Sequence, residues 1–162
     1  MDGMEQMDQM APTHDEMMFR IQQAIELGQS RDRAEARERC EELWAEIGST
    51  GDPLHRCVLA HHAADLQDDI ARELDWDQRA LQAAGDLTDD RAQQFDEALQ
   101  VRGFLPSLHL NLADVYNRLR QDEAAREHLQ LAEESLSHLP DDGYGRMIQG
   151  GVDKLALKLG PC

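Results

Sequence analysis

The residues of this chain that could do chemistry are concentrated in one segment near its middle, at positions 55–69. His61 and Asp65 are four positions apart, so on a helix they share one face. A carboxylate that fixes an imidazole is the arrangement that orients metal ligands and general bases. Residues 57, 61, 64 and 68 also fall on one helical face, since 3.6 residues per turn place them within about 60°. The full set of candidates is His55, Cys57, His61, His62, Asp65, Asp68 and Asp69.

This set has three interpretations. The simplest is a side-chain pair on a helix, with the other imidazoles packed or solvated. The alternatives are a contact to a partner and a metal or catalytic centre. A divalent metal would need further ligands, for which His109 and Asp114 are the obvious sources. The chain has neither HExxH nor ExxH, so we expect no catalytic residue, no metal and no cofactor.

The net charge of the chain indicates which classes of molecule it could bind. Sixteen basic residues stand against 33 acidic ones, which gives a formal net charge of -17. Such a field repels phosphate backbones and anionic lipids, so nucleic acid and membranes are poor partners, whereas a basic segment would be attracted. The simpler interpretation of this charge is a solvated acidic surface that keeps the protein soluble. No apolar run approaches the 18 residues of a membrane span. Hydrophobic residues make up 41% and aromatic residues 4%, which favours helices packed through Ala and Leu.

The cysteines and tryptophans are predicted to be structural. Cys40, Cys57 and Cys162 are odd in number and show no CxxC spacing, so disulfides and structural zinc are not expected, and a reducing cytoplasm is the simplest location. Trp44 and Trp76 are expected to pack between helices. An aromatic cage for a cation is the alternative for Trp76.

Apolar residues recur at helical spacing from about residue 14 to the end of the chain. Residues 1–13 form a Met-rich segment without periodicity, which predicts a disordered tail, and 14–162 are predicted to be a single domain. Asp52 and Pro53 are typical of a helix start. Pro106 is expected to break the helix that precedes it, because proline removes a ladder hydrogen bond. The alternative is that the helices at 88–102 and 106–120 are one long helix with a kink at Pro106. The expected helices cover about 14–28, 32–47, 53–66, 69–85, 88–102, 106–120, 122–138 and 145–159, with 139–145 as a loop.

The segment 106–139 carries a repeat signature. Leu112, Ala113 and Tyr116 on its first helix are followed by Ala125 and by two further apolar positions at intervals of four and three. The segment resembles a tetratricopeptide repeat, and looser copies lie at 17–50 and 53–86. The amino-acid sequence in the middle of the chain is similar to that of small actinobacterial tetratricopeptide-repeat proteins of undefined role. The resemblance implies an all-α, right-handed superhelix of about three helix pairs, with one extra helix and a C-terminal capping helix.

The resemblance also implies where a ligand would lie, because the first helix of each pair lines a concave groove in this family. The helix at 53–66 would present Cys57, His61 and Asp65, with Asp68 just beyond. The helix at 106–120 would present Asn111, Asp114 and Arg118. We therefore expect a non-enzymatic module that binds a basic or amphipathic peptide of a protein partner. A metal-dependent enzyme or small-molecule binder and a self-associating scaffold, such as a homodimer, are the alternatives.

Overall fold

The computed structural model describes residues 15–30, 32–95, 101–139 and 141–160. Every regular element in these ranges is a helix, so the all-α prediction is confirmed. The predicted tail at 1–13 lies outside the described residues. The elements are α2 (Glu16–Ser30), α3 (Arg33–Ile47), α4 (Pro53–Asp65), α5 (Ile70–Asp86), α6 (Asp89–Phe95), α7 (Val101–Arg118), α8 (Asp122–Ser135), the 3-10 turn η1 (Leu136–His138) and α9 (Gly143–Leu159).

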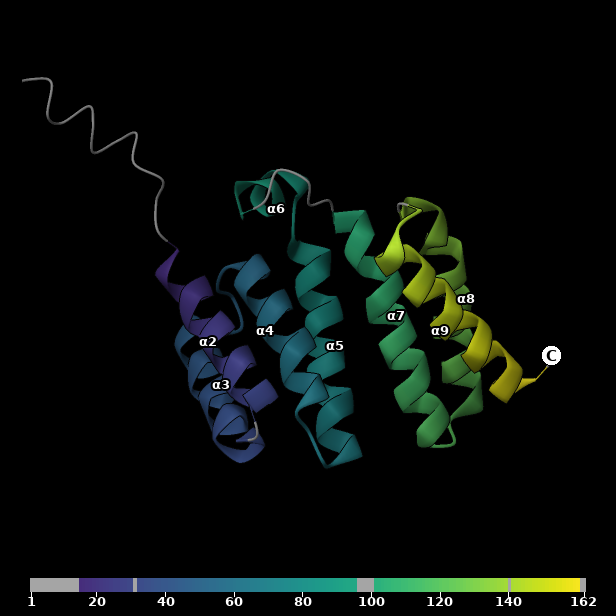
Figure 1. Ribbon diagram of the computed structural model, residues 1–162, viewed down its shortest axis with the longest axis horizontal. Helices are drawn as coiled ribbons and strands as arrows, with labels where there is room; N and C mark the ends of the chain where they lie inside the picture. Colours follow the sequence, from purple (N-terminus) through teal and green to yellow (C-terminus); the bar gives the residue numbers. More distant parts are fainter. Residues whose placement is uncertain (1–14, 31, 96–100, 140, 161–162) are drawn as a thin grey trace, which may run out of the picture.

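The long helices pack as consecutive pairs that follow one another along the molecule (Figure 1). Short turns join α2 to α3, α4 to α5 and α7 to α8, and the two helices of each pair pack together. Between pairs, α4 contacts α2 and α3, and α7 contacts α5. Helix α9 closes the row against α7 and α8. The short α6 lies across one end of α4 and α5 (Figure 1).

Several of the helices begin where an aspartate accepts hydrogen bonds from the free backbone N–H groups of the first turn. Asp52 accepts a hydrogen bond from the backbone N–H of Leu54 at 2.9 Å, and Pro53 occupies the first turn, as predicted. Asp69 accepts from the N–H of Ala71 at 2.9 Å, so this member of the candidate set is a helix cap. Asp142 caps α9, which begins at Gly143 within the segment predicted to be a loop.

Alanines bring the helices of each pair close together. Ala60 on α4, Ala80 on α5, Ala113 on α7 and Ala125 on α8 are all fully buried. One core cluster joins α2, α3, α4 and α5, with Leu108 of α7 at its edge. A second cluster lies among α7, α8 and α9. Small side chains at these positions allow close interhelical packing, which is why the alanine spacing was the most informative sequence pattern.

The predicted break at Pro106 is wrong, because α7 runs without interruption from Val101 to Arg118. Pro106 is among the most completely buried side chains, so its ring adds to the core. Its lost N–H leaves a carbonyl in the preceding turn without its usual donor. The hydroxyl of the next residue, Ser107, donates to the carbonyl of Phe104 at 3.1 Å. Within the predicted helix at 88–102, α6 covers Asp89–Phe95, residues 96–100 lie outside the described residues, and residues 101 and 102 belong to α7.

Trp44 and Trp76 pack between α3 and α5, as predicted, with ring centroids 5.5 Å apart. The guanidinium of Arg79 lies 4.4 Å from the Trp76 ring centroid and 5.1 Å from that of Trp44. A cation over an aromatic face is a favourable arrangement. The cage considered for an external cation is therefore occupied by an arginine of the same chain.

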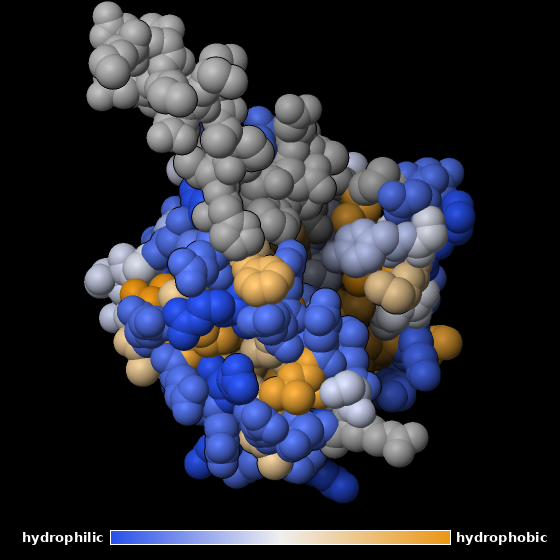
Figure 2. Space-filling model, turned by 60° about the vertical axis from the view of Figure 1, so that its left-hand side comes forward, coloured by the Kyte–Doolittle hydropathy of each residue, from blue (hydrophilic) through white to orange (hydrophobic). Residues whose placement is uncertain are grey.

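The surface is mainly polar. Figure 2 shows hydrophilic residues over most of the face that contains the N-terminal helices, with apolar residues in small separate patches. Among the described helices, none is both long enough and apolar enough to cross a membrane.

Candidate functional site

Four carboxylates from three helices form what we call the acidic cluster: Asp65 of α4, Glu73 and Asp77 of α5, and Asp114 of α7. Asp77 lies at its centre and is only 3% exposed. Burial and the negative charges of Glu73, Asp65 and Asp114 together raise the pKa of Asp77 from 3.8 to about 8, against the positive charge of Arg118, which lowers it. The cluster therefore holds more negative charge than its own cation compensates.

Arg118 is the cation that faces this cluster, and it joins two helices. Its Nη2 donates to Oε1 of Glu73 at 2.6 Å, and its Nε donates to Oδ2 of Asp114 at 3.0 Å. The hydrogen bond to Glu73 is the main reason why the pKa of Arg118 is raised. Asp77 is left out of these bonds: its carboxyl group makes no hydrogen bond and no ion pair with any residue that the structure describes.

His61 and Asn111 meet beside the cluster, although 50 positions separate them in the chain. The Asn111 Nδ2 lies 3.4 Å from the His61 Nδ1. Burial lowers the pKa of His61 more than the charge of Asp65 raises it. The ring is therefore held neutral and can act as a hydrogen-bond acceptor or donor. Within the described residues, His61 and Asp65 interact only through charge, so the hydrogen bond considered between them is absent.

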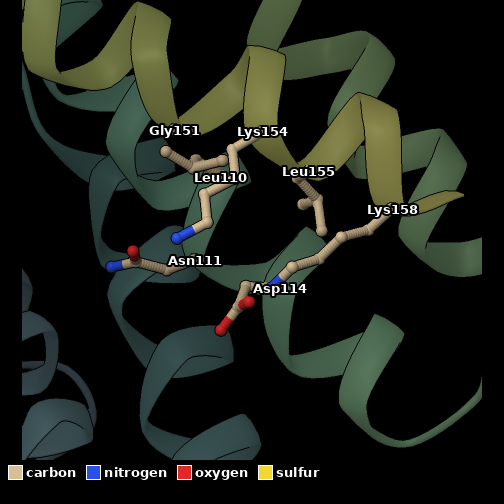
Figure 3. A pocket seen from close by; sticks show the side chains of 7 residues that line it. All are labelled: Leu110, Asn111, Asp114, Gly151, Lys154, Leu155 and Lys158. Atoms are coloured by element: carbon tan, nitrogen blue, oxygen red, sulfur yellow. The ribbon is translucent and has the colours of Figure 1, made fainter.

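A cavity of about 260 Å³, which we call the α7–α9 pocket, lies directly next to the cluster (Figure 3). Helix α7 contributes Leu110, Asn111 and Asp114, so two of the predicted binding residues line it. Helix α9 contributes Gly151, Lys154, Leu155 and Lys158. Because α9 was predicted to be only a cap, none of its residues was singled out from the sequence.

Two of the predicted binding residues lie elsewhere. Cys57 was expected to face an open groove, and this is wrong, because its side chain is 4% exposed within the core. Burial raises the pKa of its thiol to about 12. Asp68 lies in the turn after α4 and accepts a hydrogen bond from Arg37 of α3 at 3.2 Å, with Arg33 at 3.9 Å. It is drawn towards α3 and away from the acidic cluster.

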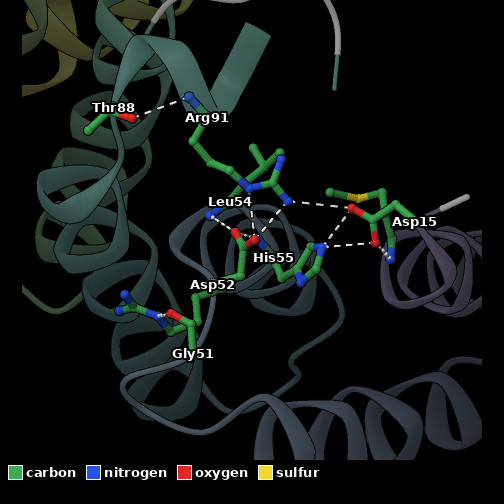
Figure 4. A network of polar contacts seen from close by, with 9 residues as sticks. Asp15, Gly51, Asp52, Leu54, His55, Thr88 and Arg91 are labelled. Atoms are coloured by element: carbon green, nitrogen blue, oxygen red, sulfur yellow. Dashed lines mark hydrogen bonds and ion pairs between the residues drawn. The ribbon is translucent and has the colours of Figure 1, made fainter. Parts of the chain in front are cut away.

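His55 belongs to a separate polar network, which joins α2, α4 and α6 (Figure 4). Its Nε2 lies 2.8 Å from Oδ2 of Asp15, and the Arg91 Nη2 lies 2.7 Å from Oδ2 of Asp52. Arg91 also reaches Asp15 at 3.5 Å. Burial opposes ionisation of both aspartates, but the hydrogen bonds and positive charges outweigh it and lower their pKa values. This network fastens α6 to the ends of two other helices.

His109, considered as a third metal ligand, is paired with another histidine. Its Nδ1 lies 3.1 Å from Nδ1 of His128 on α8, and the Tyr116 ring stacks on His128 with centroids 5.5 Å apart. Gln78 donates to the Tyr116 hydroxyl at 3.0 Å. Burial lowers the pKa of both histidines. Within the described ranges, no group of three or more His, Cys, Asp or Glu residues could hold a metal ion.

The sequence contained a signal for the residues that the prediction missed. Asp77 falls on the same helical face as Ala80 and Ala84, which are both buried, and Glu73 lies one turn before it. A charged residue at an apolar position is a stronger indication of function than a charged residue on a solvated face. It was overlooked because only the first helix of each pair was assigned to the binding surface.

Comparisons with known proteins add no assignment. No model of a protein family matches the chain, and no match was found among curated proteins or solved structures. The resemblance to tetratricopeptide repeats therefore remains a prediction that is based on the residues quoted above.

Proposed function

We propose that this protein is a non-enzymatic interaction module, and that it binds a basic or amphipathic peptide segment of a protein partner over α4, α5 and α7. The observation that carries this proposal is Asp77, a residue that is 3% exposed, whose carboxyl group has no described hydrogen-bond partner and lies among three other carboxylates. A cationic side chain brought to this point would balance the charge of these carboxylates and favour the ionised form of Asp77.

The accessible members of the cluster would make the first contact. The Asp114 side chain is 45% exposed and Asp65 is also exposed, so both can reach a ligand that approaches from solvent. An ammonium or guanidinium group between them would also lie within the field of Asp77. Charge-assisted hydrogen bonds of this kind each contribute roughly 1.5–3 kcal/mol when partly shielded from water.

The neighbouring surface suits a segment with an apolar face. Leu110 is partly buried at the wall of the α7–α9 pocket, next to Asn111 and Asp114, and Leu155 lies opposite on α9. A peptide whose basic residues meet the acidic cluster can place apolar side chains over these leucines. This combination is what an amphipathic segment provides.

The tetratricopeptide-like superhelix is part of the same proposal. It is supported by the order of the helix pairs along the molecule and by the buried Ala60 and Ala113 at the expected repeat positions. A location in the cytoplasm also belongs to the proposal, and the two free buried cysteines, Cys40 and Cys57, suit it.

The proposal can be tested with a fluorescein-labelled, amphipathic peptide of Lys and Leu, amidated at its C-terminus. Fluorescence anisotropy would compare the wild type with the Asp65→Asn, Asp114→Asn double variant. We expect a loss of affinity of about tenfold or more, which corresponds to about 1.4 kcal/mol. Circular dichroism would verify that the variant is folded.

A matched control separates this site from the general attraction of an acidic protein for a cation. Glu38→Gln with Glu42→Gln changes the net charge by the same amount on the exposed part of α3, away from the cluster. The control is expected to change the affinity by less than about twofold, as screened surface charges do at physiological salt. Equal losses in the two double variants would refute the proposed site.

A further inference from the structure

The two lysines of α9 are unusual in this chain. Lys154 and Lys158 are the only lysines among its 162 residues. They are four positions apart, which puts both on one face of the helix, and both line the α7–α9 pocket. Figure 3 shows Lys154 extending towards Asn111 and Lys158 extending towards Asp114. Both lysine side chains of this acidic protein thus belong to the lining of one cavity.

Neither ammonium group forms an ion pair with a residue that the structure describes, although Lys158 extends towards Asp114 (Figure 3). Most arginines in that part of the chain form ion pairs, for example Arg20 with Glu46, Arg37 with Asp68 and Arg79 with Asp75. Neither Lys154 nor Lys158 forms such a pair. Like charges four apart on a helix repel each other by a few tenths of a kcal/mol. An anionic group placed between them would relieve this repulsion.

At this cavity α9 has a glycine, Gly151, where it faces Leu110 of α7. A Cβ atom added at Gly151 would lie 2.8 Å from Cδ2 of Leu110, which is too close for van der Waals contact. Glycine inside a helix is unfavourable relative to alanine. With a larger residue at this position the Leu110 side chain would have to shift, so Gly151 leaves this side chain its place in the wall. Leu110 and Leu155 then form the apolar part of the wall.

From these observations we infer that the α7–α9 pocket binds an acidic side chain of the partner segment, with its carboxylate between Lys154 and Lys158 and an adjacent apolar side chain over Leu110 and Leu155. The inference rests on the proposed function, because Asp114 belongs both to this pocket and to the acidic cluster. The partner segment therefore carries both a basic and an acidic residue, and we call such a segment bipolar. Its basic residue meets the acidic cluster, and its acidic residue meets α9.

A carboxylate fits this pocket better than a polyanion does. Asp114 forms part of the lining, and the net charge of the chain is -17, so each added negative charge on a ligand is opposed by the surrounding field. A single carboxylate brings one charge, which two ammonium groups more than balance. The Asn111 amide, which can donate or accept a hydrogen bond, lies on the same wall.

The small number of lysines allows a direct test. Protein labelled with ¹³C and ¹⁵N in lysine alone gives side-chain NMR signals only from Lys154 and Lys158. The probes are a bipolar peptide with a Lys-rich half and a Glu-rich half around a Leu pair, and the all-basic Lys and Leu peptide. We expect the bipolar peptide to shift both lysine signals saturably, and the all-basic peptide to leave them nearly unchanged.

Affinity measurements complete the test. Lys154→Gln with Lys158→Gln should weaken binding of the bipolar peptide by roughly five- to tenfold, and should not weaken binding of the all-basic peptide. The inference is overturned, with the proposed function intact, if the all-basic peptide binds at the acidic cluster but the Glu-rich half neither shifts the lysine signals nor adds affinity. It is also overturned if free glutamate shifts the lysine signals as strongly as the bipolar peptide at equal concentration. If the lysines respond but Asp65→Asn with Asp114→Asn has no effect, the anionic site stands and the proposed function fails.

Discussion

Arg118 and Glu73 hold α7 against α5 through a contact of 2.6 Å between Nη2 of the arginine and Oε1 of the glutamate. The two residues are 45 positions apart in the chain. Arg118 also holds Asp114 on its own helix, and it is the cation that lowers the pKa of Asp77. One guanidinium group therefore interacts with three of the four carboxylates in the acidic cluster. It forms ion pairs with Glu73 and Asp114 and acts on Asp77 through its charge alone.

Replacing Arg118 should destabilise the protein through repulsion within the acidic cluster. We expect Arg118→Gln to lower the free energy of unfolding at pH 7 by about 1 kcal/mol, because Glu73 and Asp114 lose their partner. Added salt should restore part of this loss by screening the carboxylates. Urea unfolding at low and high salt would measure both effects. Arg72→Gln, at an exposed position of α5 without a described ion pair, is the control and should change little. A salt-independent loss would contradict this account.

Asp77→Asn should stabilise the protein increasingly as pH rises from about 4 to 8. The folded-state pKa of Asp77 is raised from 3.8 to about 8, so in this window the unfolded chain releases a proton that the folded chain retains. Stability due to this group is therefore complete below pH 3.8 and falls until the pH passes 8. Asparagine does not titrate, and it resembles the protonated carboxyl group in shape.

The difference between the two proteins should reach the order of a few kcal/mol near pH 8, since each pH unit within the window corresponds to about 1.4 kcal/mol. Urea unfolding at pH 5 and at pH 8 would measure it. Asp90→Asn, at an exposed position of α6, serves as the control. A constant difference between the Asp77→Asn variant and the wild type at both pH values would exclude a raised pKa.

The sequence predicted the helices well, because their determinants are local. Asp52 with Pro53 marked the start of α4, and Ala113 with Leu112 marked the buried face of α7. These features depend on capping and on helical period, both of which can be read within one or two turns. Pro106 failed as a helix breaker because burial of its ring, a tertiary effect, outweighs the local cost.

The candidate site was predicted only in part, because its electrostatics depend on packing between helices. Five of the candidate residues lie in or beside one region: His61, Asp65, Asn111, Asp114 and Arg118. The partner of Arg118 and the central carboxyl group both come from α5, a second helix of a pair. The lysines come from α9. No local pattern shows which residues of different helices will meet.

Arg91→Gln should release α6 from the rest of the protein. Arg91 bonds Asp52 and Asp15, and all three side chains are less than one-third exposed. Loss of these charge-assisted bonds should lower the free energy of unfolding at pH 7 by about 1–3 kcal/mol. Hydrogen exchange should accelerate at the Ala92 amide, which bonds the carbonyl of Thr88. Arg20→Gln, which removes an exposed ion pair with Glu46, should change stability by less than about 1 kcal/mol.

The effect of Arg91→Gln should depend on pH in a direction opposite to that of Asp77→Asn. The folded-state pKa values of Asp15 and Asp52 are lowered, so their contribution is present above the unfolded value of 3.8 and is lost as pH falls through the folded values. The wild type and the variant should therefore converge in stability below about pH 4. A difference that is the same at pH 3 and pH 7 would argue against these ion pairs.

Cys40 and Cys57 should be almost unreactive in the folded protein. Burial raises the pKa of their thiols to about 11 and about 12, and their side chains are 1% and 4% exposed. The thiolate is the nucleophile, so alkylation at pH 8 should be slower than for a free thiol by roughly a hundredfold or more. Mass spectrometry after iodoacetamide treatment of the Cys162→Ser variant would measure this, with the urea-unfolded variant as reference. Rapid labelling of Cys57 in the folded protein would contradict this prediction, because it would show that the thiol is accessible to solvent.

Binding of a basic peptide should release protons from Asp77. A cation at the acidic cluster favours the ionised carboxylate, whereas in the free protein the raised pKa of about 8 keeps this group mainly protonated at pH 7. Affinity for the Lys and Leu peptide should therefore increase with pH up to about 8 and level off above it, by at most tenfold per pH unit. Isothermal titration calorimetry at pH 7 in phosphate and in Tris would detect the released protons, because the two buffers differ in ionisation enthalpy. The Asp77→Asn variant should show neither the pH dependence nor the difference between buffers. If the wild type binds with the same enthalpy in both buffers, the bound cation does not act on Asp77, and contact is limited to the exposed Asp65 and Asp114.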